Sequence, residues 1–122
     1  MPTEYQLPVY HHGTLLNDPC RPYQGHYRGP EDTCRKVAYH NGTAWCWPFP
    51  AYCEALYMLG GEASRNRAMS LLMSAAPLFE NGISGQLPEV LEGDAPHVPG
   101  GCPAQAWSVS EFFRVLKILE KK

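Results

Sequence analysis

Proline and glycine residues restrict where this chain can form helices. Its 122 residues include 12 prolines and 11 glycines, most of them within residues 1–50 and 77–103. Proline lacks a backbone N–H, and glycine loses much conformational entropy on folding, so both interrupt regular helices. We therefore expect loops in these two regions, with at most a short strand before residue 38. Helices should lie between and after them.

The segment between the two regions carries two predicted helices. The first begins at Pro50, a residue type favoured in a first helical turn, and continues through Met58 until the Gly60–Gly61 pair ends it. The second covers residues 62–78, where apolar side chains recur at helical spacing and form one face. That face consists of Ala68, Leu71, Leu72 and Ala75.

The last segment of the chain has the clearest helical pattern. Apolar residues recur every three or four positions from residue 109 onward, with charged residues opposite them, and Lys121 and Lys122 suit the negative carboxyl end of a helix. We therefore predict a mainly α chain, a single domain over residues 1–122, with about three helices, long loops and room for a short β-hairpin near residues 83–90. The predicted apolar stripe is Val109, Phe112, Phe113, Leu116 and Leu119.

Charge and composition exclude several classes of partner. The formal net charge is −2, and no stripe of lysine or arginine is present, so neither nucleic acid nor an anionic membrane is an expected partner. No apolar run approaches the ~20 residues that a membrane span needs. The first residues lack the basic start and apolar core of a secretory signal. We expect a cytoplasmic protein.

The five cysteines form no recognisable framework. Their number is odd, whereas a disulfide framework favours an even number. No two are spaced as the C-x-x-C pair that is typical of zinc sites. His11 and His12 lie near Cys20 and Cys34 in the sequence, but their spacing matches no recurrent zinc pattern. We expect reduced, partly buried thiols, no metal and no cofactor.

A first loop segment, residues 38–48, alternates hydrogen-bonding side chains with flat aromatic ones. Sugars present hydroxyl groups at their edges and C–H patches on their faces, so a sugar site needs both kinds of side chain. The alternative is that Trp45 and Trp47 are core residues and that residues 40–42 only form a turn.

A second loop segment, residues 85–97, brings three carboxylates together between prolines and glycines: Glu89, Glu92 and Asp94. A carboxylate held in a loop can activate water as a general base, and glycoside hydrolysis needs one such group opposite a proton donor. The alternative is that all three are solvated loop charges.

Both segments resemble motifs of one enzyme family. Residues 39–48 read Tyr-His-Asn-Gly-Thr-Ala-Trp-Cys-Trp-Pro and resemble a segment of the glucosidase domain of bacterial and archaeal glycogen debranching enzymes. Residues 89–109 are similar to the closing motif of that domain, from its glutamate to Ala-Gln-Ala-Trp-Ser-Val. The resemblance extends over roughly residues 20–120, and the second motif is too long to arise easily by chance.

The resemblance implies an (α/α)6 toroid and amylo-α-1,6-glucosidase chemistry with inversion at the sugar carbon. It implies that Glu89 is the general base and that an aspartate upstream of the first motif, outside this chain, is the general acid. A whole toroid needs on the order of 200 residues or more, so we expect a partial toroid, the C-terminal segment of the domain. The residues implied to bind glucose are Tyr39, His40, Asn41, Thr43, Trp45, Gln105 and Trp107.

The expected ligand is therefore an α-glucan or glucose. Apolar helix faces that neighbouring hairpins normally bury would favour a homo-oligomer or a partner chain. Because an inverting hydrolase needs two carboxyl groups, we expect little hydrolysis by this chain alone. The alternative is a non-catalytic α-glucan-binding or regulatory module that retains the sugar-facing loops.

Overall fold

The computed structural model describes residues 7–121, which form two compact units. Of the described residues, the mixed unit comprises 7–44 and 90–100, and the helical unit comprises 45–89 and 101–121. Each unit is described separately. The described residues are mainly helical with a few short antiparallel strands, which confirms the predicted class at this level. None of the described helices is long and apolar enough to cross a membrane.

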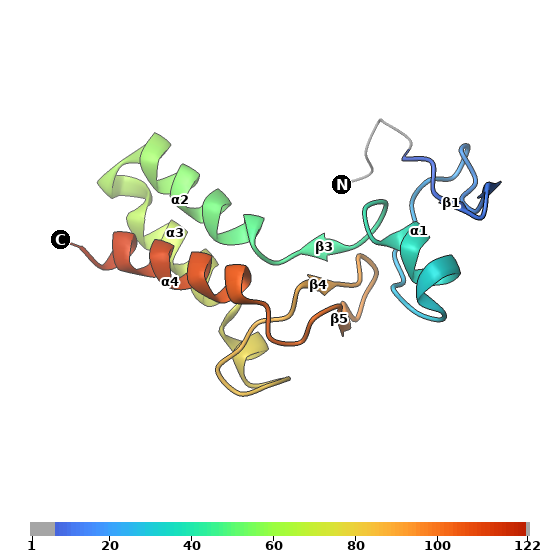
Figure 1. The fold of residues 1–122 in the computed structure, drawn as a ribbon. Coiled ribbons are helices and arrows are strands. Elements are labelled where there is room, and N and C mark those ends of the chain that lie inside the picture. Colours follow the sequence, from blue (N-terminus) through green and yellow to red (C-terminus); the bar gives the residue numbers. More distant parts are fainter. Residues whose placement is uncertain (1–6, 122) are drawn as a thin grey trace. The chain divides into compact units, whose positions relative to one another are not determined.

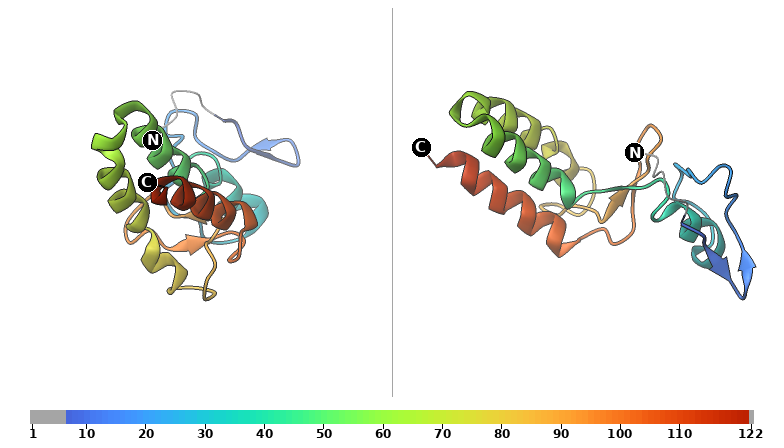
Figure 2. Two further views of the ribbon diagram at one scale, coloured as in Figure 1. Left: turned by 90° about the vertical axis from the view of Figure 1, so that its left-hand side faces the viewer. Right: turned by 90° about the horizontal axis from the view of Figure 1, so that it is seen from above.

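Three long helices make up most of the helical unit and lie side by side (Figures 1 and 2). The first begins two residues earlier than predicted, because Pro48 and Pro50 both fall in its first turn, where a missing N–H breaks no helical hydrogen bond. A left-handed Gly61, with φ of 58°, ends this helix and leads into the next. The elements are α2 (Pro48–Gly60), α3 (Glu62–Met73), the short 3-10 helix η2 (Ala76–Phe79) and α4 (Ala106–Glu120).

The core of the helical unit lies between these helices. Phe112 packs edge-to-face against Phe79 and Phe113, with ring centroids 4.9 and 5.8 Å apart. Aromatic pairs in this geometry stabilise a core beyond the area they bury. The buried members of the core are Cys53, Ala68, Leu72, Leu87, Phe112, Val115 and Leu119.

The predicted apolar faces are largely confirmed. On α3, Ala68 and Leu72 are buried, and Leu71 is partly buried. The single helix predicted over residues 62–78 is divided into α3 and η2. On α4, the expected stripe needs one correction. Val115 is fully buried, whereas Phe113 is half-exposed at the edge of the core.

The mixed unit contains short strands and one helical segment. A two-residue hairpin pairs Tyr10 with Leu15, and a second antiparallel pair aligns Val90 with Gly100. The second pair belongs to a sheet of order β3-β4-β5, in which Ala44 is the residue of β3 that belongs to this unit. The elements are β1 (Tyr10–His11), β2 (Thr14–Leu15), the π-helix η1 (Glu31–Arg35), α1 (Lys36–Ala38), β3 (Ala44–Trp45), β4 (Val90–Leu91) and β5 (Pro99–Gly100).

Two predictions of local structure were wrong in detail. Residues 31–38 are helical rather than looped or extended: they follow Pro30, and Glu31 and Asp32 suit the positive amino end of a helix. The β-hairpin forms at residues 90–91 and 99–100, later than the predicted residues 83–90. Residues 83–89 contain only turns and irregular backbone.

Candidate functional site

The backbone of Glu89 is anchored on both sides within the helical unit. Its N–H donates to the Cys102 carbonyl at 2.9 Å, and its own carbonyl accepts the N–H of Cys46 at 3.1 Å. Two residues earlier, the buried Leu87 accepts the N–H of Gln105 at 2.9 Å. Two other stretches of sequence, residue 46 and residues 102–105, therefore hold residues 87–89 in one position.

The carboxylate of Glu89 is also held. Its Oε2 accepts the backbone N–H of Cys102 at 2.9 Å, and the residue is half-buried. A hydrogen bond to an ionised acceptor is stronger than one between neutral groups, so it fixes the carboxylate more firmly. The alternative of a freely solvated loop charge is thus wrong for Glu89.

Three tryptophans of the same unit lie close together. The ring of Trp107, in the first turn of α4, lies 6.2 Å from that of Trp45 and 6.4 Å from that of Trp47, centroid to centroid. We call these three residues the tryptophan cluster. Trp47 and Trp107 are 42% and 48% exposed, and Trp45 is half-buried. The alternative that Trp47 is a core residue is therefore wrong, and the cluster presents apolar ring surface to solvent.

The helical unit thus contains four of the residues expected at the sugar site. Gln105 is the residue before α4, so it positions the start of the helix that carries Trp107. The backbone hydrogen bond between Gln105 and Leu87 ties that start to the segment leading into Glu89. The four residues are Trp45, Glu89, Gln105 and Trp107.

The other four expected residues belong to the mixed unit. Thr43 donates its hydroxyl to the Tyr39 carbonyl at 2.7 Å, and the Tyr39 and His40 rings pack edge-on, 4.8 Å apart. Asn41 is buried and donates its amide to the carbonyl of Val37 at 3.1 Å. Residues 40–42 form a turn after α1, as the alternative for this segment expected. Their role in sugar binding stays a prediction.

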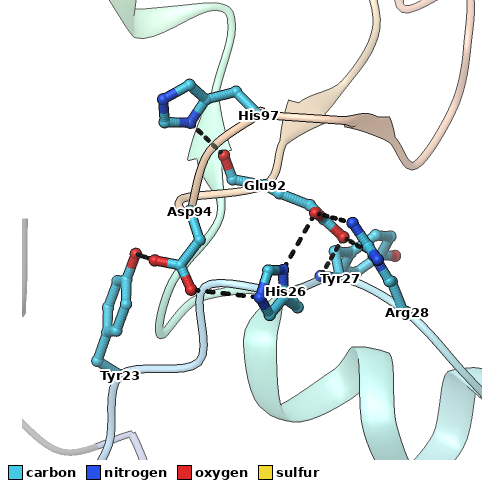
Figure 3. A network of polar contacts seen from close by, with 7 residues as sticks. All are labelled: Tyr23, His26, Tyr27, Arg28, Glu92, Asp94 and His97. Atoms are coloured by element: carbon cyan, nitrogen blue, oxygen red, sulfur yellow. Dashed lines mark hydrogen bonds and ion pairs between the residues drawn. The ribbon is translucent and has the colours of Figure 1, made fainter.

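The mixed unit contains a polar cluster that the sequence did not reveal. Glu92 is only 2% exposed, and its carboxylate lies between Arg28 and His26 (Figure 3). Arg28 donates from Nε and Nη2 at 2.6 and 2.8 Å, the backbone N–H of Tyr27 donates at 3.2 Å, and His26 Nδ1 lies 3.2 Å away. The alternative of a solvated loop charge is therefore wrong for Glu92.

Asp94 and two further side chains extend this cluster. The Tyr23 hydroxyl donates to Asp94 at 2.8 Å, and His26 Nε2 lies 3.7 Å from the other Asp94 oxygen. His97 Nδ1 lies 3.0 Å from the Glu92 carbonyl (Figure 3). We call this set the Glu92 network: Tyr23, His26, Tyr27, Arg28, Glu92, Asp94 and His97.

The network strongly favours an ionised Glu92. The two hydrogen bonds from Arg28 lower the pKa of Glu92 to about 2, with His26 and the Tyr27 amide adding to the effect. The hydrogen bond to Asp94 raises the pKa of Tyr23. Two glycines allow the close packing: a Cβ on Gly25 would lie 2.2 Å from the Asp94 carboxyl, and one on Gly93 would lie 2.1 Å from the Gly42 carbonyl. The network therefore joins residues 23–28 to residues 92–97.

All five cysteines are free thiols. Burial raises the pKa of Cys46 to about 11, so this thiol stays protonated at neutral pH. Among residues 7–121, no group of three or more histidine, cysteine, aspartate or glutamate side chains is arranged to hold a metal ion.

Comparison with known proteins identifies the family. No curated protein and no solved structure matches this chain. A family model described as amylo-alpha-1,6-glucosidase matches residues 13–114, which include both sequence motifs and the four expected site residues of the helical unit. The chain therefore belongs to the amylo-alpha-1,6-glucosidase family.

Proposed function

We propose that this chain supplies the general base and part of the glucose subsite of an inverting α-1,6-glucosidase. Glu89 is the base, and the tryptophan cluster contacts the apolar faces of the sugar. The observation that carries the proposal is the Glu89 carboxylate, fixed by the Cys102 N–H in the unit that also contains the cluster. Membership of the glucosidase family supports the reaction class.

A fixed carboxylate suits the role of a general base. Glu89 Oε2 accepts one backbone N–H, which limits its motion without neutralising it. In the proposed reaction Glu89 removes a proton from water as the water attacks the anomeric carbon, and the bond to the leaving oxygen breaks. The acid that protonates this oxygen must lie roughly 6.5–9.5 Å from the base. We propose that it comes from a further part of an (α/α)6 toroid.

A substrate with a good leaving group separates the two roles. Fluoride leaves without help from an acid, so α-D-glucosyl fluoride needs only the base. Water attacks the anomeric carbon, Glu89 takes its proton, and fluoride departs to give β-glucose. We expect this chain to hydrolyse α-glucosyl fluoride with inversion and to release little glucose from isomaltose, an unactivated α-1,6-linked substrate.

Two glutamate variants control this assay. Glu89→Gln should remove the hydrolysis, whereas Glu80→Gln, an exposed glutamate of the same unit, should retain it. Proton NMR identifies the anomer released first. Equal rates for wild type and Glu89→Gln, or release of α-glucose, would contradict the proposed role of Glu89.

A second candidate function is glucan binding without hydrolysis. The observation in its favour is the exposure of Trp47 and Trp107, whose rings can stack on sugar faces without any catalytic group. Titration with maltotriose, followed by tryptophan fluorescence, tests it. Saturable quenching that Glu89→Gln leaves unchanged, with no hydrolysis of glucosyl fluoride, would favour this function over the first.

The proposed toroid predicts an interaction surface on the helical unit. Tyr52, Met58 and Leu59 on α2 are 58%, 74% and 90% exposed. We propose that further helical hairpins of the toroid cover these side chains, or that another copy or a partner chain does so. Analytical ultracentrifugation of the full chain should detect self-association. A dilute monomer that remains monomeric at high concentration would contradict assembly through a second copy.

A further inference from the structure

The turn at Gly101 and Cys102 lies directly against the Glu89 carboxylate. The Cys102 N–H donates to Oε2, and the Glu89 N–H donates back to the Cys102 carbonyl, both at 2.9 Å. Glu89 and Cys102 are thus joined through both their backbones and the carboxylate. The position of this carboxylate depends on the backbone conformation of residue 101, because that conformation sets the direction of the Cys102 N–H.

Gly101 has two features that few other residues could reproduce. Its φ is +70°, a left-handed conformation that side chains disfavour. A Cβ added there would lie 2.3 Å from Glu89 Oε2, 3.0 Å from its Cβ and 3.1 Å from its carboxyl carbon. The space that a side chain would need is already occupied by the carboxylate.

The expected consequence of filling this space is local. The nearest colliding atom is the far end of a flexible glutamate side chain, which can rotate away at modest cost. A methyl group at residue 101 should therefore move the carboxylate off the Cys102 N–H while the helices keep their packing. The substitution would therefore displace the Glu89 carboxylate, whose position the proposed reaction requires.

We propose that Gly101 is a positioning residue for Glu89: its missing side chain and left-handed backbone let the Cys102 N–H hold the carboxylate. As an account of catalysis, this inference rests on the proposed function. The hydrogen bond itself can be tested without any substrate.

The matched control is Gly85. It belongs to the same unit and also has a left-handed backbone, with φ of +74°, but a Cβ added there would meet no atom within 4 Å. Gly101→Ala and Gly85→Ala therefore introduce similar backbone strain, and only the first collides with Glu89. Any difference between them reports the displaced carboxylate rather than the strain.

The direct readout is the Cys102 amide in proton–nitrogen NMR spectra of the full chain. An amide that donates to a carboxylate shifts when that carboxyl group loses its proton. We expect the wild type and Gly85→Ala to show this pH-dependent shift of Cys102, and Glu89→Gln to lose it. Gly101→Ala should lose it too, while amide dispersion elsewhere in the spectrum stays native.

A Cys102 shift that persists in Gly101→Ala would overturn the inference. So would a wild-type Cys102 shift that Glu89→Gln leaves unchanged, a result that needs no folded glycine variant. In the glucosyl fluoride assay we expect Gly101→Ala to lower kcat at least tenfold with KM little changed, and Gly85→Ala to alter neither. If the wild type shows the amide shift but no hydrolysis, the proposed function fails and the positioning by Gly101 stands.

Discussion

The guanidinium of Arg28 donates two hydrogen bonds, of 2.6 and 2.8 Å, to the carboxylate of Glu92, which lies 64 positions later in the sequence. Glu92 is almost fully buried, whereas Arg28 is largely exposed. A buried carboxylate is tolerated only with such a partner, because leaving it unpaired carries a large desolvation penalty. This pair therefore joins the two segments of the mixed unit that carry the Glu92 network.

Removing the cation should destabilise the mixed unit strongly. Arg28→Ala leaves the Glu92 carboxylate buried without its main partner, so we expect the unfolding temperature to fall by roughly 5 °C or more. Arg21→Ala, at an exposed position of the same unit, should have little effect. Adding Glu92→Leu to Arg28→Ala should recover part of the loss. Equal melting temperatures for the two arginine variants would contradict this reading.

Acid should weaken the contribution of Glu92. Its pKa lies at about 2 in the folded chain, below its ordinary value of 4.5, so the ionised form stabilises the fold. This contribution is fully present above about pH 5 and is lost as the pH falls toward 2. We expect Glu92→Gln to be less stable than wild type at about pH 6, with the difference shrinking by about pH 3. Urea unfolding at both pH values measures it, and a constant difference would contradict the assigned pKa.

The core of the helical unit should depend on one ring more than on its neighbour. Phe112 is 3% exposed, whereas Phe113 beside it on α4 is 48% exposed. Truncating a buried phenylalanine removes apolar contacts and leaves a cavity, so Phe112→Ala should cost about 3–5 kcal/mol of the free energy of unfolding. Phe113→Ala should cost much less. Chemical denaturation of both variants measures the difference, and similar losses would show that the core lies elsewhere.

The cysteines should differ in reactivity according to their exposure. Cys20, Cys34 and Cys102 are exposed, while Cys53 is buried and burial raises the pKa of Cys46 to about 11. Because the thiolate is the reactive form, iodoacetamide at about pH 8 should modify the three exposed thiols first. Peptide mass spectrometry should find Cys46 and Cys53 modified only after denaturation. Equal labelling of Cys46 and Cys102 in the native chain would contradict the partial burial and the raised pKa of Cys46.

The long helices could be predicted from the sequence because their signals are local. The apolar repeats that predict α3 and α4 lie within those helices. The prolines and glycines that predict α2 lie at its two ends. The short helical segment at residues 31–38 was missed because it lacks an apolar repeat, although Glu31 and Asp32 after Pro30 were a usable signal. Val115 was missed although it lies three residues after Phe112 and four before Leu119 and so fits the same repeat.

The candidate site could be predicted only in part. The motif resemblance singled out Glu89 and Trp107, and the helical unit contains both, with Trp45 close to Trp107. The burial of Glu92 was not predictable in the same way, because a charged residue in a loop gives no local sign of a partner 64 positions away. Gly101 was visible in the sequence as a turn residue, but its approach to Glu89 is a property of the folded backbone.

We propose that Glu89 and the tryptophan cluster belong to one glucose site. A cationic iminosugar of glucose configuration tests it most directly, since its ammonium group should pair with an ionised base while its ring contacts the tryptophans. Titration followed by tryptophan fluorescence should give the same affinity for wild type and Glu80→Gln. Glu89→Gln should bind about tenfold more weakly, or worse, because a charged hydrogen bond is lost. Equal affinity of wild type and Glu89→Gln, or no response from the wild type, would contradict the account.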